Sequence, residues 1–125
     1  MKILILDDNE FRHKAFKKKF NLPQDKLTHT YTTEECIKVL TDTTIKDKFD
    51  LIYLDHDLGG EEMVLSDQGT GYEVAEFIAY DMDQAKLPTI GIVVHSLNPI
   101  GRKNMLVILH NSNCKVIDGP FAWKN

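Results

Sequence analysis

Residues 49–60 read Phe-Asp-Leu-Ile-Tyr-Leu-Asp-His-Asp-Leu-Gly-Gly, and this stretch decides the fold expected for the chain. A continuous apolar run is typical of a strand that is buried on both faces of a parallel sheet. The run ends in two carboxylates, Asp55 and Asp57, with His56 between them. If the strand continued this far, Asp55 and Asp57 would point to one side and His56 to the other. Three ionisable groups at the end of a buried strand are costly without partners, so we expect a functional site here.

Further apolar runs alternate with stretches of helical spacing along the chain. Short apolar runs predict strands, and apolar residues three and four positions apart predict helices that bury one face. We expect strands at residues 2–6, 27–31, 90–94 and 115–117, and helices at residues 10–20, 33–40, 71–85 and 99–110. This alternation is typical of an α/β fold with helices on both faces of a five-stranded parallel sheet.

Two segments carry more specific expectations. In the first helix, the spacing predicts that Phe11, Ala15, Phe16 and Phe20 face the core. Residues 59–71 form an acidic, glycine-bearing connection that is longer than most strand-to-helix loops. Its length predicts a functional loop or a lid.

The composition limits the classes of function. A chain of 125 residues is expected to form one domain, residues 1–125. The formal net charge of -4 argues against an extended nucleic-acid surface, although a small nucleotide ligand remains compatible with it. No apolar run is long enough to cross a membrane, and Cys36 and Cys114 fit no metal-binding spacing. We therefore expect a cytoplasmic protein with reduced thiols and no membrane partner.

Polar residues follow the ends of four expected strands. Asp7 and Asp8 follow the first, Asp55, His56 and Asp57 the third, His95 and Ser96 the fourth, and Asp118 the fifth. Ligands of open parallel sheets bind beyond the carboxyl ends of the strands. The sequence therefore predicts a site at this edge of the sheet.

The order of these elements resembles the receiver domain of two-component response regulators. The matching residues are the acidic pair Asp7-Asp8, Asp55 at the end of the third strand, and residues 119–121 after the fifth. The resemblance implies a flavodoxin-like, three-layer fold with strand order 2-1-3-4-5. Gly119 replaces the lysine of the receiver pattern, and the chain is too short to include the last receiver helix. The missing lysine argues against aspartate phosphorylation as the function.

The chain more closely resembles a divergent family, the cyclic-phosphate-processing receiver domains. The resemblance rests on Asp7-Asp8 followed by Arg12, on Leu-Asp-His-Asp-Leu at 54–58, on Gly-Thr-Gly at 69–71, and on Val-His-Ser-Leu-Asn-Pro at 94–99. It implies action on the cyclic phosphate of an RNA end or of a small nucleotide.

The acidic residues form the expected metal site. Asp7, Asp8 and Asp55 would repel one another at the sheet edge, so a divalent cation such as Mg2+ is their natural partner. The alternative for Asp8 is a helix cap, and the alternative for Asp57 is a plain loop residue.

The two histidines at strand ends are the expected acid–base groups. His56 and His95 would face one pocket and transfer protons when a cyclic phosphate opens, with Asp55 and Asp57 as the other catalytic residues. Asp57 would orient His95 or the metal. The alternative is that one of the histidines only packs and caps.

Three further residues are candidates for binding the phosphate. Arg12 can clamp a phosphate with two hydrogen bonds, and Ser96 and Asn98 can donate to it at the start of the last helix. A salt bridge to the aspartates is an equal alternative for Arg12. N-capping is an equal alternative for Ser96 and Asn98.

The sequence therefore favours a metal-dependent phosphohydrolase that acts on a cyclic phosphate. One alternative is a degenerate receiver that binds a nucleotide or a partner protein without catalysis. Another is a regulator phosphorylated on Asp55. Because no helix is expected after the fifth strand, one sheet face is left for a partner or for a second copy in a homodimer.

Overall fold

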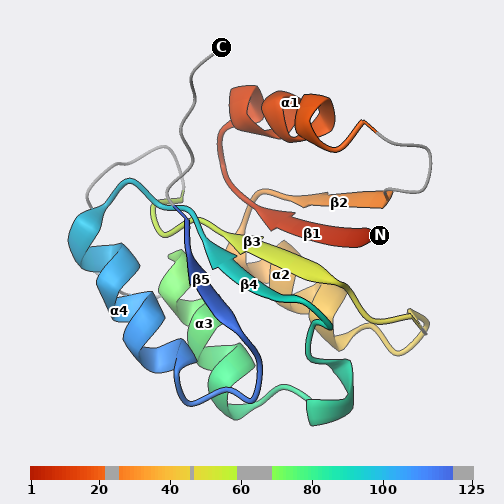
Figure 1. Cartoon of the computed structure of the whole chain (residues 1–125), viewed down its shortest axis with the longest axis vertical. Helices are drawn as coiled ribbons and strands as arrows, with labels where there is room; N and C mark the ends of the chain where they lie inside the picture. Colours follow the sequence, from red (N-terminus) through yellow and green to blue (C-terminus); the bar gives the residue numbers. More distant parts are fainter. Residues whose placement is uncertain (22–25, 46, 59–68, 120–125) are drawn as a thin grey trace.

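Five parallel strands form one sheet in the computed structural model, which describes residues 1–21, 26–45, 47–58 and 69–119. The strands are β1 (Lys2–Leu6), β2 (Lys26–Thr30), β3 (Leu51–Leu54), β4 (Gly91–Val94) and β5 (Val116–Asp118). Their order in the sheet is β2-β1-β3-β4-β5 (Figure 1), and every neighbouring pair is parallel. The expected sheet and strand order are confirmed.

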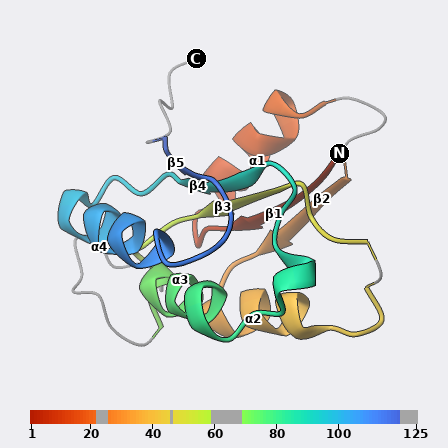
Figure 2. The same cartoon turned by 60° about the horizontal axis from the view of Figure 1, so that its bottom comes forward.

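In the described residues, four helices cover the two faces of the sheet. They are α1 (Glu10–Lys19), α2 (Thr33–Thr41), α3 (Gly71–Tyr80) and α4 (Pro99–Leu109), and a short 3-10 helix, η1 (Gln84–Lys86), follows α3. Helix α1 lies on one face, and α2, α3 and α4 lie on the other (Figures 1 and 2). The result is the three-layer arrangement expected from the sequence.

The apolar core is divided by the sheet into two clusters. Alternate residues of β1 show the division, because Ile3 and Ile5 pack on the side of Phe16 from α1, whereas Leu4 and Leu6 join the larger cluster under α2, α3 and α4. All four of these strand residues are fully buried. Burial on both faces explains why β1 reads as a continuous apolar run.

The inward face of α1 differs from the expected one. Phe11 is 71% exposed, whereas His13 and Phe16 are fully buried. The helix is capped by Asn9, whose side chain accepts the backbone N–H of Arg12. Each residue advances about 100° around a helix, so with Phe16 inward the residue three positions earlier, His13, also faces the core, and Phe11 does not. The assignment of Phe11 to the core was wrong.

Other element boundaries also differ from the expected ones, most of them by one residue. Helix α3 ends at Tyr80 rather than Ala85, because Asp83 caps the separate helix η1 by accepting the N–H of Ala85. Strand β5 begins and ends one residue later than expected. Strand β3 ends at Leu54, before Asp55.

Three expectations concern residues that lie largely outside the described part of the chain. Most of the predicted lid belongs to residues 59–68, which are not described. The Gly-Pro-Phe corner and the expected absence of a last helix concern residues 120–125, which are not described either.

Within the described ranges, every helix is too short or too polar to cross a lipid bilayer.

Gly71 allows α3 to start directly against the segment that carries the candidate site. Its backbone N–H donates to the carbonyl of His56 at 2.8 Å. A Cβ at Gly71 would lie 1.7 Å from the carbonyl oxygen of Asp55, which is a backbone atom and cannot rotate away. Any larger residue would therefore push α3 away from the end of β3.

We expect Gly71→Ala to lower the free energy of unfolding by about 3 kcal/mol, the upper end of the usual cost of overpacking, because the new methyl group must displace backbone. Gly69→Ala is the matched control, because Gly69 has φ +84° but open space where a Cβ would lie. That substitution should cost only about 1 kcal/mol of backbone strain. Urea unfolding measures both, and equal losses in the two variants would contradict the packing argument.

Candidate functional site

Three adjacent strands deliver Asp7, Asp55 and His95 to one point at the carboxyl edge of the sheet. Leu6 of β1 is in register with Leu54 of β3, which is in register with Val94 of β4. The ladder extends one residue further, because Asp55 N–H donates to the Leu6 carbonyl and His95 N–H to the Leu54 carbonyl. All three side chains are buried. The predicted convergence of these residues is therefore present.

The carboxylate of Asp7 is the centre of the cluster. Its Oδ1 accepts the backbone N–H of Asn9 at 2.9 Å and Nη2 of Arg12 at 2.9 Å. Its Oδ2 accepts Nε of Arg12 at 2.7 Å and Nε2 of His95 at 2.9 Å. Burial alone would raise the pKa of Asp7, but the hydrogen bonds from His95 and Arg12 outweigh it and hold the pKa below its ordinary value. Asp7 is therefore a buried, fully ionised group.

Arg12 reaches from the first turn of α1 across three carboxylates. Besides its two contacts with Asp7, its Nη2 lies 3.1 Å from Oδ2 of Asp55 and 3.8 Å from Oδ1 of Asp8. Of the two alternatives for Arg12, the structure confirms the salt bridge to the aspartates. A contact with phosphate stays a prediction, and the 20% exposure of the Arg12 side chain leaves the guanidinium within reach of a ligand.

The carboxylate of Asp55 is less stabilised than that of Asp7. Its Oδ1 accepts the N–H of His56 at 2.9 Å, and its Oδ2 accepts only Arg12 among the contacts described. Burial, together with the negative charges of Asp7 and Asp8, outweighs the attraction of Arg12 and raises the pKa of Asp55 to about 7. A carboxyl that titrates near neutral pH can both accept and donate a proton under cellular conditions.

His95 is a neutral, buried partner of Asp7. Because a carboxylate only accepts, Nε2 of His95 must carry the proton that it shares with Asp7. The ring packs against Phe16 and Tyr53, with centroids 5.5 and 6.0 Å away. Burial lowers the pKa of His95, although Asp7 partly opposes this. Its Nδ1 has no hydrogen-bond partner among the described residues.

His56 belongs to a second group of contacts, beneath the start of α4. Its Nδ1 lies 2.8 Å from Oδ1 of Asp57, which also accepts Nδ2 of Asn98 at 3.0 Å. A Cβ on Gly101 would lie 2.4 Å from Cγ of His56, so the ring packs directly against the helix backbone. Because β3 ends at Leu54, the alternation expected for residues 55–57 does not apply, and Asp57 pairs with His56 rather than orienting His95.

Two of the expected phosphate ligands hold the backbone before α4. Asn98 is the N-cap, with its side-chain oxygen accepting the N–H of Gly101 at 3.0 Å. Oγ of Ser96 accepts the N–H of Asn98 at 3.1 Å, and both residues are buried. The capping alternative is confirmed for Asn98, and Ser96 supports the same turn. Direct contact of either residue with phosphate stays a prediction.

Three carboxylates are close enough to offer oxygen ligands to one metal ion. Single oxygens of Asp7, Asp8 and Asp55 lie within 4.8 Å of one another. Hard oxygen ligands of this kind suit Mg2+. The same three carboxylates are the partners of Arg12, so a metal ion and the guanidinium would compete for them.

Sequence reasoning did not assign two further residues to the site, His13 beside Asp7 and Arg102 beside Ser96. Nε2 of His13 lies 2.7 Å from the carbonyl oxygen of Asp7, and Nδ1 of His13 lies 2.6 Å from Nδ1 of His29. Arg102 joins Ser96 to Asp118 by donating to the Ser96 carbonyl and contacting the Asp118 carboxylate at 3.0 Å. The spacing of His13 and Phe16, three residues apart, was the available signal for His13.

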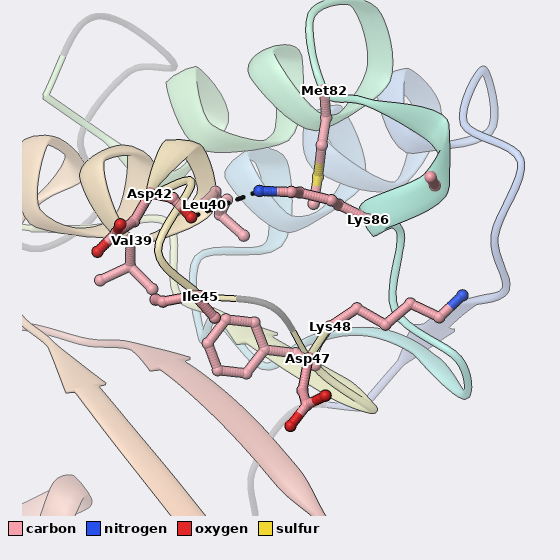
Figure 3. A pocket seen from close by; sticks show the side chains of 10 residues that line it. Val39, Leu40, Asp42, Ile45, Asp47, Lys48, Met82 and Lys86 are labelled. Carbon is pink, nitrogen blue, oxygen red and sulfur yellow. Dashed lines mark hydrogen bonds between the residues drawn. The ribbon is translucent and has the colours of Figure 1, made fainter.

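A separate cavity of about 450 Å3 lies at the amino end of β3 (Figure 3). Its walls come from the end of α2, the segment before β3, the residue Met82 after α3, and η1. Lys86 crosses it to donate to the carbonyl of Asp42 at 3.4 Å. Since the strands are parallel, this cavity and the Asp7–Asp55 cluster lie at opposite edges of the sheet.

A family model matches most of the chain. The model of a family described as "Cyclic-phosphate processing Receiver domain" matches residues 2–111. No curated protein matches the chain.

Solved structures give a likeness of fold. The non-phosphorylated receiver domain of HemR from Leptospira biflexa superposes with a TM-score of 0.62 at 19% sequence identity. The match covers 96% of this chain and 82% of the HemR domain. At this identity the comparison shows that the two share the receiver fold.

The pKa of Asp55 predicts an unusual dependence of stability on pH. An ordinary aspartate ionises near pH 4, whereas Asp55 keeps its proton in the folded state up to about pH 7. Between these values the folded state binds more protons than the unfolded state, so stability from this group is lost as pH rises towards 7. We expect Asp55→Asn to be more stable than the wild type at pH 8 by about 1 kcal/mol or more, with the gain vanishing near pH 4.

Urea unfolding at both pH values measures this gain, and Asp50→Asn is the control. Asp50 precedes the other end of β3, and a hydrogen bond from Thr89 lowers its pKa, so its replacement should reduce stability at pH 8. An Asp55→Asn variant that is less stable than the wild type at pH 8 would contradict the burial argument.

Proposed function

Since the chain belongs to the family of cyclic-phosphate processing receiver domains, we propose that it opens a cyclic phosphate by hydrolysis at the site around Arg12 and Asp55. The observation that carries the proposal is the contact of a partly exposed guanidinium with a buried carboxyl, 3.1 Å apart. The substrate is a small nucleotide or an RNA end, because both present a cyclic phosphodiester with one negative charge.

The proposed reaction needs a proton acceptor, a proton donor and a positive charge. The oxygen of a water molecule bonds to phosphorus, the bond from phosphorus to one ring oxygen breaks, and a proton from the water ends on the departing oxygen. Asp55 takes the proton from water as a carboxylate and returns it to the departing oxygen. Arg12 stabilises the negative charge on the two non-bridging oxygens.

The other candidate residues either position these two or hold the start of α4. His95 and Asn9 fix the carboxylate of Asp7, which in turn fixes Arg12. His56, Asp57 and Asn98 hold the start of α4 against the end of β3. In this assignment His56, His95 and Asp57 are positioning residues. Ser96 and Asn98 serve the phosphate by presenting the N-terminus of α4, which attracts anions.

A binding module without catalysis is the second candidate, and one observation favours it. The side chain of Asp55 is only 5% exposed, and the imidazoles of His56 and His95 are 0% and 1% exposed. Groups that exchange protons with a substrate must reach it, so this burial favours recognition over proton transfer. Under this alternative, Arg12 binds the cyclic phosphate and no bond is broken.

Phosphorus NMR with a panel of cyclic phosphates tests the proposal. The panel holds 2′,3′-cyclic nucleotides, 3′,5′-cyclic nucleotides and an RNA with a 2′,3′-cyclic end. We expect the wild type to convert at least one class to a phosphomonoester. Asp55→Asn should reduce the rate by about 100-fold or more, because it removes the acid–base group.

Asp50→Asn is the matched control, since it makes the same change at the opposite end of β3, and its rate should equal that of the wild type. Saturable binding without conversion would support the binding module instead. An acyl phosphate on Asp55 after incubation with acetyl phosphate would support the regulator. If the protein neither binds nor converts any member of the panel, the proposed function is contradicted.

A further inference from the structure

The guanidinium of Arg12 occupies the place where a divalent cation would bind the acidic cluster. Its nitrogens contact all three candidate metal ligands, at 2.7 and 2.9 Å from the two oxygens of Asp7, 3.1 Å from Asp55 and 3.8 Å from Asp8. The three carboxylates lie within 4.8 Å of one another around it. One cation, supplied by the chain itself, already joins them.

The oxygens of Asp7 have little capacity left for a metal ion. Each accepts two hydrogen bonds, Oδ1 from Asn9 and Arg12, and Oδ2 from His95 and Arg12. Mg2+ requires ligand oxygens at about 2.0–2.1 Å in near-octahedral geometry. To bind Asp7 it would have to displace Arg12, and the two positive charges would repel each other at these distances. A site that uses all three carboxylates therefore does not fit Mg2+ while Arg12 is in place.

Arg12 is also held where it is by the fold. It lies in the first turn of α1, and the N-cap residue of that helix, Asn9, accepts the Arg12 N–H through its side chain while donating its own N–H to Asp7. Asp7 is thus tied to both the backbone and the side chain of the same helical turn. The bidentate geometry of a guanidinium on a carboxylate is stronger than a single contact between two charges.

We infer that Arg12 replaces the divalent cation in this site and keeps divalent metals out of it. Arg12 offsets part of the negative charge of the cluster without metal, and it is the positive charge that faces an anionic ligand. The consequence that turnover needs no metal rests on the proposed function, whereas the exclusion of metal does not. The expectation of Mg2+ held by Asp7, Asp8 and Asp55 is replaced by this inference.

Metal binding without any substrate tests the inference. Thermal unfolding of the wild type should give the same midpoint in about 10 mM MgCl2 as in chelator, and a titration of MnCl2 followed by electron paramagnetic resonance should show no ordered site in the millimolar range. Arg12→Ala removes the guanidinium from the three carboxylates. Its midpoint should rise by roughly 5 °C or more in the same MgCl2 concentration.

Arg102→Ala is the matched control. Arg102 is partly exposed like Arg12, but its described contacts go to Ser96 and Asp118 and not to the acidic cluster. Its midpoint should not respond to MgCl2. If Arg12→Ala does not fold in chelator, recovery of its folded structure on adding MgCl2 would support the inference, and failure to recover would count against it.

Two results would overturn the inference. One is a wild type that MgCl2 stabilises as much as Arg12→Ala. The other is an ordered Mn2+ site in the wild type. If the wild type binds Mn2+ and loses turnover when chelator is added, the inference is overturned and the proposed function stands. A protein that excludes metal and converts no cyclic phosphate would contradict the proposed function and leave the inference standing.

Discussion

The buried carboxylate of Asp7 must stay charged inside the protein, and the arrangement of the site follows from that requirement. Donors from β4, from α1 and from the turn between β1 and α1 converge on its two oxygens. Removing the partner of a buried charge typically costs about 3–5 kcal/mol. The need to satisfy Asp7 therefore fixes the positions of His95 and Arg12 relative to the sheet.

Because Arg12 is shared with Asp7, it compensates the negative charge of Asp55 only in part. Arg12 gives its shortest contacts to Asp7 and a longer one to Asp55, so Asp7 is ionised at all ordinary pH values and Asp55 is not. One shared positive charge thus separates the pKa values of Asp7 and Asp55. Environments that push the pKa values of neighbouring acids apart are typical of acid–base sites.

The fold and the location of the site could be predicted from the sequence, but the contacts within the site could not. Apolar runs gave the strands, and parallel strands necessarily bring Asp7, Asp55 and His95 to one edge. The direction of each side chain depends on the residue at which a strand ends and on the rotation of each helix. Strand β3 ends at Leu54, which frees His56 to turn towards Asp57, and the cap at Asn9 sets the rotation of α1 that buries His13. A shift of one residue in either place redirects every side chain that follows.

Arg12 is a fixed part of the acidic cluster, and nitrogen NMR of the arginine side chains can test this. The chain has two arginines, Arg12 and Arg102, so the two Nε–H signals can be assigned by a single substitution. The account predicts that the Nε–H of Arg12 exchanges with solvent much more slowly than that of Arg102, whose partner Asp118 is exposed. Equal exchange rates for the two arginines would contradict it.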